Sequence, residues 1–462
     1  MHKVYIAMLV VVSFFYTWVA LANHTHFQTF AFDLGVYDQL IWKYSQGLPA
    51  VSSMLDNRPA FAIHFQPFFI LLAPIFWLWN DVRALLIVQS VVLVAAAYPL
   101  FLLGRSILKH ELLAASVAIS YVFYFATQYT AFSDFHTDAF IPLFLAAAVL
   151  FAHKKRMIGY WVMVMLLLLL KEWVGFLMIA VGIVFLLQRR LFQGSGTILA
   201  GIFGFLIAYW VMNQSSPAGQ NTIEFGFGEL GRGPTDVIIT LITKPWLAFQ
   251  HLFLPTEKLS TIWSTIWPFG PFALLSPVWL LPILEQFGHR FYDLERPFRW
   301  GIGLHYSLPM GVLLGISTVY GLQRIPRKWF GWCAGILIVL TICEIVIFRL
   351  PILSLLKPQF YQEERWIADT RAALSMIPKD AAVATQNNLA PHLSHREKLY
   401  LLPIVGDAEY IAVDLHPGQS LYNFMTQSEG EMRQMVSQLR ESEDWSVIFE
   451  EGDALVLRRS IK

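Results

Sequence analysis

Charge and cysteine are both scarce in this chain. Charged residues make up 14% of its 462 residues, whereas soluble domains average about 25%. The two cysteines, Cys333 and Cys343, share one apolar run, and on a helix they would lie about 15 Å apart, too far for a disulfide. Cysteine and histidine spacings typical of zinc sites are missing as well. These absences exclude a wholly soluble protein and a disulfide framework. A net charge of +1 names no partner, and we expect no nucleic acid to be one.

Apolar sequence takes the place of charge. Hydrophobic residues make up 56% of the chain, and its mean hydropathy is +0.54. Because lipid cannot satisfy open backbone groups, the spanning elements must be helices. The sequence therefore predicts an α-helical polytopic membrane protein with about 10 spans of the length a bilayer requires. The expected spans are Val4–Ala22, Val82–Gly104, Leu112–Thr130, Ala139–Ala152, Met157–Leu170, Trp173–Gln188, Thr197–Met212, a broken region within Lys258–Phe287, Ile302–Leu322 and Phe330–Phe348.

Positive charge orients these spans. Lys3 places the N-terminus in the cytoplasm, so the residues that follow the first span lie outside. The apolar run Phe65–Trp79 is ambiguous, because it is long enough to be considered a span. If it lies flat on the outer surface, the basic clusters Arg105–Lys109 and His153–Arg156 both fall inside. We prefer this topology, which makes residues 23–81 one long external loop that carries surface helices.

The composition changes at about Pro351. Residues 351–462 alternate between helical and strand patterns, so we expect a small extracytoplasmic α/β domain after a transmembrane domain of residues 1–350. Neither a G-x-G-x-x-G motif nor a P-loop occurs in residues 351–462, which argues against a nucleotide-binding domain. The expected helices are 360–377 and 431–440, and the expected strands are 381–385, 398–403, 410–414, 445–450 and 454–458.

Two acidic residues, Asp33 and Asp38, follow the first span closely. A carboxylate held between lipid and a polar loop can bind a metal or act as a base. The two do not share a helix face, but a chain reversal at Gly35 would bring them together. The alternative is that both are ordinary solvated acids. The apolar neighbours Phe32 and Leu34 favour a partly buried site for Asp33.

A second polar cluster lies in the next external loop. Asp134, His136 and Asp138 alternate along the chain, so an extended backbone would point all three side chains in one direction. Together with Asp33 they are candidate ligands for a hard divalent ion such as Mg²⁺ or Mn²⁺. The competing explanation is that Thr137 or Asp138 caps the following helix, a role that is compatible with metal binding.

The pair Lys171-Glu172 interrupts a long apolar stretch. Charges in such a stretch are costly and mark either a turn or a functional site. If the pair faces a cavity, Lys171 is suited to bind a phosphate. His64 and His305-Tyr306 lie at the same predicted interface, where a structural hydrogen-bonding role is the alternative to substrate binding.

These motifs together resemble a known group of enzymes. A first span, a long external loop with acids near its start, and acids in the second external loop are similar to the GT-C superfamily of membrane glycosyltransferases. Members of this superfamily include protein mannosyltransferases, aminoarabinose transferases and oligosaccharyltransferases. More closely, the chain resembles an uncharacterised bacterial family of predicted membrane proteins. The motifs that carry this resemblance are FDLGVYDQLIW, the stretch from His64 to Leu72, DFHTDAF, the Lys171-Glu172 turn and LHYSLP.

The resemblance implies transfer of a sugar from a polyprenyl-phosphate donor to a glycan, lipid or protein of the cell envelope, in the bacterial inner membrane and at its outer face. It implies that Asp33 activates the acceptor, with Asp38 as the alternative, and that the reaction inverts the anomeric centre. Asp138 falls where the superfamily has a second-loop acid, and Lys171 falls near a lysine suited to the donor phosphate. His305-Tyr306 is similar to a Tyr-x-x-Pro segment at the start of a span. A consecutive Asp-Glu pair, present in protein mannosyltransferases, is missing here, which leaves the base and metal dependence open.

Two other functions compete with this hypothesis. A transporter or flippase for a lipid or solute would carry charges at the membrane midplane and inverted repeats, whereas the charges here cluster at one face. A non-catalytic membrane scaffold, whose C-terminal domain binds envelope partners, is the third possibility.

Overall fold

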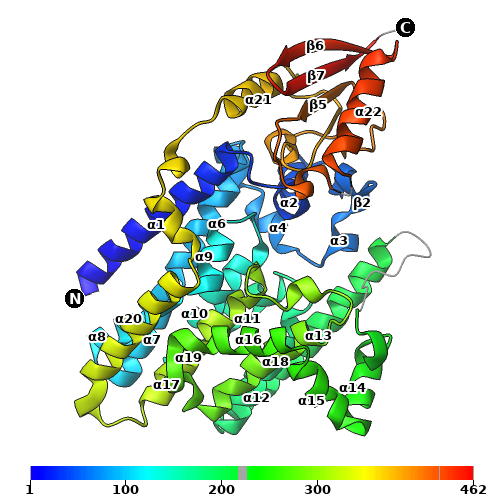
Figure 1. Ribbon diagram of the computed structural model, residues 1–462. Helices are drawn as coiled ribbons and strands as arrows, with labels where there is room; N and C mark the ends of the chain where they lie inside the picture. Colours follow the sequence, from blue (N-terminus) through cyan, green and yellow to red (C-terminus); the bar gives the residue numbers. More distant parts are fainter. Residues whose placement is uncertain (1, 217–225, 426, 461–462) are drawn as a thin grey trace.

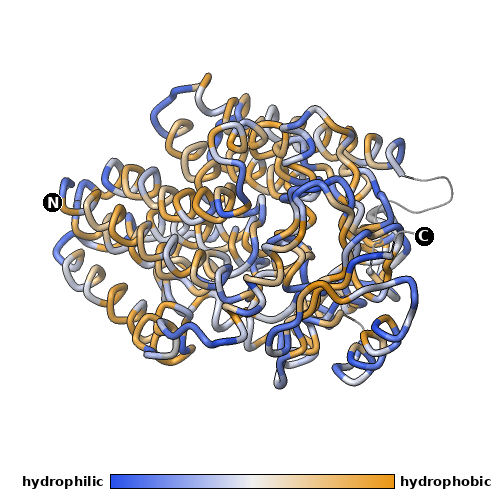
Figure 2. Tube along the Cα trace, turned by 90° about the horizontal axis from the view of Figure 1, so that it is seen from above, coloured by the Kyte–Doolittle hydropathy of each residue, from blue (hydrophilic) through white to orange (hydrophobic). Residues whose placement is uncertain are grey.

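The computed structural model describes residues 2–216, 226–425 and 427–460. A bundle of helices forms its body, and a small mixed sheet with flanking helices sits at one end of the bundle (Figure 1). Apolar residues follow the helices of the bundle, while hydrophilic residues gather in the connecting segments (Figure 2). This arrangement confirms the predicted fold class, a polytopic helical protein with a small C-terminal α/β region.

Four helices among the described residues are long and apolar enough to cross a membrane, and a pair bent by 50° is a fifth candidate. Other predicted spans are shorter apolar helices. The long helices are α1 (His2–Thr25), the consecutive α6 (Arg83–Ala95) and α7 (Ala97–Leu108), α13 (Leu191–Ser215) and α20 (Phe330–Ile347). The bent pair is α8 (Glu111–Val122) with α9 (Phe125–Ala131), and the shorter helices are α10 (Ile141–His153), α11 (Met157–Leu168), α12 (Val174–Leu187) and α19 (Leu308–Leu322).

The bend between α8 and α9 is stabilised from across the bundle. The backbone amide of Phe125, freed by the break, donates a hydrogen bond of 2.9 Å to Oε1 of Glu344 on α20. Glu344 is fully buried, and a free amide in apolar surroundings needs an acceptor. The glutamate therefore stabilises a bent span that the hydropathy pattern alone presents as continuous.

Helices α12 and α13 pack through glycine. A Cβ atom on Gly175 would lie 2.7 Å from the carbonyl oxygen of Gly201, and one on Gly201 would lie 2.5 Å from that of Gly175. Only residues without a side chain permit this backbone approach. The contact brings the start of α12, next to Lys171, against the middle of α13.

The ambiguous run Phe65–Trp79 forms two short helices, α4 (Phe68–Leu72) and α5 (Ile75–Leu78), each preceded by a proline. Trp77 and Leu78 are exposed, as expected for helices at a surface. The region within Lys258–Phe287 is broken, as predicted. Its elements are α16 (Thr256–Ile266), η5 (Trp267–Phe269), α17 (Gly270–Leu274), η6 (Pro277–Trp279) and α18 (Leu280–Phe291), and α14 (Pro234–Thr243) and α15 (Pro245–Phe253) precede them.

The C-terminal region contains a five-stranded sheet of order β4-β3-β5-β7-β6. β3 runs parallel to β4 and β5, while β7 is antiparallel to β5 and β6. The strands are β3 (Val383–Thr385), β4 (Leu399–Leu401), β5 (Tyr410–Asp414), β6 (Trp445–Glu451) and β7 (Ala454–Arg459), and the helices are α21 (Arg365–Ser375) and α22 (Glu429–Glu441). All seven of these elements follow the predicted pattern.

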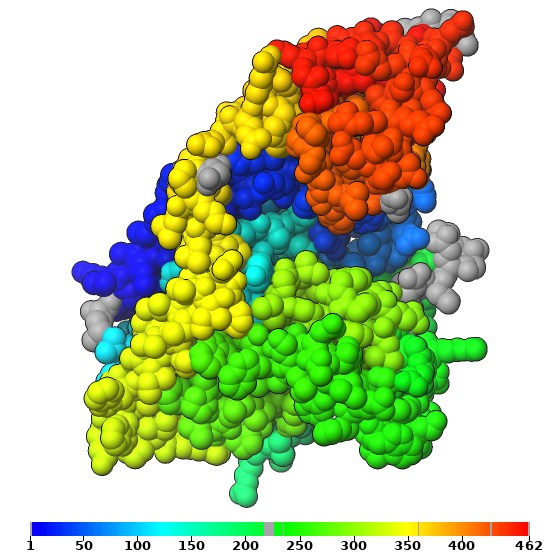
Figure 3. Space-filling model, viewed as in Figure 1, coloured from blue at the N-terminus to red at the C-terminus, as the bar shows by residue number. Residues whose placement is uncertain are grey.

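The C-terminal region is seated on the loop that follows α1 (Figure 3). That loop contains η1 (Ala31–Gly35), α2 (Val36–Ser45) and α3 (Ala60–Ile63). One hydrophobic core runs from the bundle through Leu40 on α2 into the sheet at Leu399. The two regions are therefore packed together rather than joined by a linker alone.

Candidate functional site

Three loops bring polar side chains together beneath the C-terminal region. Asp33 comes from η1, His136 precedes η3 (Thr137–Phe140), and His305 begins η8 (His305–Ser307). Asp33 Oδ2 lies 3.1 Å from His136 Nε2, and the rings of His136 and His305 have centroids 3.7 Å apart. The His136 side chain is 4% exposed, whereas that of Asp33 is 40% exposed. The imidazole is thus fixed while the carboxylate keeps an open side.

The contacts of His136 determine where its protons lie and which charge state the site favours. Its Nδ1 lies 2.8 Å from the carbonyl oxygen of Asp134, which can only accept, so Nδ1 carries a proton. Nε2 then faces the Asp33 carboxylate at ion-pair distance, although the direction is poor for a hydrogen bond. Burial lowers the pKa of His136, but the carboxylates of Asp33, Asp138 and Asp134 together outweigh burial and raise it. The site therefore favours the imidazolium form of His136.

The partner carboxylate is ionised for the same reason. Burial raises the pKa of Asp33, but the opposing charge on His136 lowers it by more. The pKa of Asp33 therefore lies well below its usual value. Asp33 also has a backbone φ of 71° and ψ of −82°, a conformation that costs a residue with a side chain about 1–3 kcal/mol and is frequent at functional sites.

Two glutamines hold the loops in place, and sequence reasoning missed both. Gln89 on α6 donates to the carbonyl of Asp134 and accepts from the amide of His136, at 3.0 and 2.8 Å. Gln66 donates to the hydroxyl of Thr137 at 2.7 Å. Both glutamines are buried. A polar residue inside an apolar run was the available signal for Gln89.

Lys171 and Asp138 form a buried ion pair beside this cluster. Their charged atoms lie 3.3 Å apart, and the side chains are 10% and 6% exposed. Burial lowers the pKa of Lys171, but the Asp138 carboxylate raises it above its ordinary value, so the ammonium persists. Asp138 of the second external loop and the Lys171 turn are thereby in direct contact.

Glu172 joins the same region to the first loop. Its carboxylate accepts from His64 Nδ1 at 2.9 Å and from the backbone amide of Phe65 at 3.1 Å. Burial raises the pKa of Glu172, while the charge of His64 and its hydrogen bond lower it, to about 2 overall. Both residues fix the position of the turn rather than leave a free charge.

His305 and Tyr306 extend the cluster beyond His136, with the ring of Tyr306 centred 4.2 Å from that of His305. Burial and the charge on His136 lower the pKa of His305 well below its usual value, so His305 is neutral. The guanidinium of Arg299 lies 5.0 Å over the ring of Tyr306 and forms an ion pair with Asp293. The sequence presented Arg299 only as one of several external cations, because an arginine in a loop gives no pattern that sets it apart.

The predicted metal ligands do not converge on a common point. Asp134 turns its Oδ1 to the backbone amide of Phe30, at 3.0 Å, and Asp138 is paired with Lys171. Across the part of the chain that the structure describes, no three His, Cys, Asp or Glu side chains come close enough to hold an ion. The residues present thus do not fit a divalent metal, and metal dependence stays a prediction.

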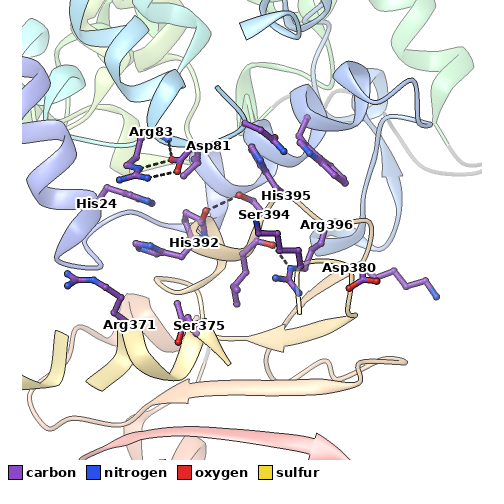
Figure 4. A pocket seen from close by; sticks show the side chains of 18 of the residues that line it. His24, Asp81, Arg83, Arg371, Ser375, Asp380, His392, Ser394, His395 and Arg396 are labelled. Atoms are coloured by element: carbon purple, nitrogen blue, oxygen red, sulfur yellow. Dashed lines mark hydrogen bonds and ion pairs between the residues drawn. The ribbon is translucent and has the colours of Figure 1, made fainter. Parts of the chain in front are cut away.

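Asp38 lies apart from Asp33. It is fully buried, and its carboxylate accepts from the hydroxyl of Ser394 at 2.5 Å and contacts His395 Nε2 at 3.1 Å. Ser394 and His395 line a cavity of about 1170 Å³ between the bundle and the C-terminal region (Figure 4). Arg83, paired with Asp81, borders this cavity from the bundle side. The structure therefore joins Asp38 to the C-terminal region and does not bring it to the Asp33 cluster.

An apolar groove of about 270 Å³ lies on the side of the bundle near Lys171. Phe65 forms one end of the groove, and its amide is the one bonded to Glu172. The groove is lined by Phe65, Trp161, Val164, Met165, Leu168, Leu169, Ala200, Gly204 and Ile207. Leu169 of this lining lies two residues before Lys171 in the chain.

Comparison with solved structures assigns the class of the fold. The chain is similar to ArnT from Cupriavidus metallidurans, crystallised with undecaprenyl phosphate, with a TM-score of 0.58 and 11% sequence identity, covering 98% of this chain and 97% of ArnT. The protein is thus a membrane protein of the GT-C glycosyltransferase fold. The family model described as "Predicted membrane protein (DUF2079)" matches residues 23–457, and the chain belongs to that family. A search of curated proteins gave no match.

Proposed function

We propose that the protein is a membrane glycosyltransferase that moves a sugar from a polyprenyl-phosphate donor to a glycan, lipid or protein of the cell envelope. The carrying observation is the half-exposed carboxylate of Asp33, held by the buried imidazolium of His136. The GT-C fold supports this proposal, and the ArnT that shares it was crystallised with undecaprenyl phosphate. The charge pattern of the sequence supports a reaction at the outer face of the membrane, and the family resemblance supports the bacterial inner membrane.

Asp33 serves as the base for the acceptor. An acceptor hydroxyl or amine transfers its proton to the carboxylate as its oxygen or nitrogen forms a bond to the anomeric carbon. The bond between that carbon and the phosphate oxygen breaks, and its electron pair leaves with the polyprenyl phosphate. A single displacement of this kind inverts the anomeric centre. No step runs through a metal.

The donor lies between the groove and Lys171. The apolar groove accepts the polyprenyl chain, and Lys171 meets the phosphate on which negative charge develops. Asp138 keeps Lys171 protonated and oriented. Arg299, over the ring of Tyr306, supplies a second cation on the far side of the cluster.

The function is tested with the full-length protein in proteoliposomes that contain a polyprenyl-phosphate sugar with a labelled sugar, together with an envelope fraction as acceptor. Label transferred to the acceptor, with release of polyprenyl phosphate, is the expected result. Movement of intact donor across the bilayer without transfer would identify a flippase. The absence of both would identify a scaffold and refute the proposal.

A further inference from the structure

The loop that carries Asp33 is held from the C-terminal region. The backbone amide of Ala31 donates to the carbonyl oxygen of Asn387 at 2.9 Å and to its side-chain Oδ1 at 3.0 Å. The ring of Phe30 packs edge-on against Tyr422, with centroids 4.7 Å apart. Ala31 and Asn387 are fully buried. Two consecutive residues before Asp33 thus contact a part of the chain more than 350 positions away.

The orientation of the Asn387 amide is defined by its other partner. Its Nδ2 donates to the carbonyl of Tyr422 at 2.8 Å, which can only accept. This bond leaves Oδ1 as the atom that faces Ala31, so a flipped amide would break both contacts. The backbone amide of Asn387 also donates to the carbonyl of Asn423 at 3.0 Å. The side chain is therefore fixed by its own domain before it meets the loop.

Asn387 occupies a particular place in the sheet. It follows β3, which lies between the parallel neighbours β4 and β5. In α/β folds the carboxyl ends of parallel strands are where ligands bind. Here the loop that carries Asp33 binds at that position, where a ligand binds in other α/β folds.

The unusual backbone conformation of Asp33 requires that the residues beside it be held in place. Its positive φ is disfavoured for a residue with a side chain and persists only if the flanking residues are held. On one side, Phe30 is held by Asp134 and Ala31 by Asn387. On the other side, Gly35 donates back to the carbonyl of Phe30 at 3.1 Å. Of these contacts, only that of Asn387 comes from outside the bundle.

We propose that Asn387 is a positioning residue for Asp33. The C-terminal region thereby contributes to the geometry of the catalytic site. The proposal rests on the proposed function of Asp33 as the base. Asn387 touches neither substrate nor the reacting atoms; it acts through Ala31. Removal of its side chain leaves the Ala31 amide with the Asn387 carbonyl oxygen as its one acceptor in that residue and also removes the contact with Tyr422. The loop is then held less firmly, and the Asp33 carboxylate loses its alignment with His136.

The test is hydrogen exchange measured by mass spectrometry on the full-length protein, comparing Asn387→Ala with the native chain. We expect peptides covering residues 30–35 to exchange at least about 10-fold faster in the variant. The matched control is Asn388→Ala. Asn388 is equally buried and lies in the same loop, but its side chain accepts from Gln386 within the C-terminal region, at 2.9 Å. This control should leave exchange at residues 30–35 unchanged.

A second variant, Asn387→Asp, distinguishes the loss of this contact from general misfolding of the protein. Asn387→Asp keeps an oxygen for the Ala31 amide but places a carboxylate against the carbonyl of Tyr422, so we expect an intermediate exchange rate. In the transfer assay, Asn387→Ala should lower kcat at least about 10-fold with the donor KM unchanged, whereas a purely structural role would reduce only the amount of folded protein. Equal exchange at residues 30–35 in the Asn387 and Asn388 variants overturns the proposal. If exchange responds as expected but the native protein transfers no sugar, the proposed function fails and the role of Asn387 in positioning Asp33 for catalysis fails with it.

Discussion

His136 holds Asp33 through one ring nitrogen and is itself held through the other. Nε2 lies 3.1 Å from the Asp33 carboxylate, while Nδ1 donates to the carbonyl of Asp134 at 2.8 Å. The contact at Nδ1 keeps the proton on that nitrogen, and the neighbouring carboxylates raise the pKa of the ring. The site thus favours a pair of imidazolium and carboxylate, with the open side of the carboxylate free for a substrate.

Replacement of His136 should move the acidic limb of the pH profile. The imidazolium lowers the pKa of Asp33, so His136→Asn should raise that pKa and shift the limb of kcat/KM to higher pH. At neutral pH we expect a loss of about 10- to 100-fold in kcat/KM from the lost charge and orientation. His395→Asn is the control, because His395 contacts Asp38 rather than Asp33 and its replacement should leave the limb in place. An unshifted limb in His136→Asn would contradict the assigned charges.

Lys171 should govern the affinity for the donor. Lys171→Met is expected to raise the donor KM at least about 10-fold, because the phosphate loses its cation. The single variant also leaves Asp138 buried without a partner, which costs about 3–5 kcal/mol. The double variant Lys171→Met/Asp138→Asn removes that penalty and isolates the effect on the donor. An unchanged donor KM in the double variant would exclude Lys171 from phosphate binding.

The apolar groove should discriminate donors by the length of their lipid chain. Ala200→Trp fills the groove and should raise the KM for a long polyprenyl donor about 10-fold or more, while a donor with a short prenyl chain is affected less. Leu206→Trp is the matched control, since Leu206 is on the same helix, exposed and outside the groove. Equal effects of the two variants on long and short donors would place the chain elsewhere.

Asp38 should affect stability more than chemistry. Asp38→Asn weakens the contacts with Ser394 and His395, and we expect a loss of about 1.5–3 kcal/mol, as for hydrogen bonds to a charged group. Thermal unfolding of the purified protein measures the change. Transfer per folded molecule should stay within a few-fold of the native rate. Abolished transfer in a fully folded Asp38→Asn protein would restore Asp38 as a catalytic candidate.

Local patterns in the sequence predicted the elements of this fold well. Apolar runs marked the spans, and short strand-like segments marked β5 at residues 410–414 and β7 near residues 454–458. The positions of the basic clusters relative to the spans placed Asp33, His136 and Lys171 on one face of the membrane. The structure brings these residues into one region. The pattern did not show the bend at Phe125, because the glutamate that stabilises it lies on a distant helix.

Local sequence patterns did not predict which side chains contact one another within the site. Asp38 turns toward Ser394 because α2 begins directly after Gly35 and carries it away from Asp33. Asp134 is used by the amide of Phe30 rather than by an ion. Asn387 reaches Ala31, in the loop of Asp33, from the C-terminal region. Contacts over such separations leave no periodic signal in the sequence.

The most direct test of the account is transfer by Asp33→Asn. This substitution preserves the size of the side chain and removes the base, so we expect sugar transfer from the labelled donor to fall about 100- to 10,000-fold, while donor binding and thermal stability stay close to native. Asp33→Glu, which keeps a carboxylate on a longer stem, should retain part of the activity. Native transfer rates in a folded Asp33→Asn protein would contradict the central claim that Asp33 is the catalytic base.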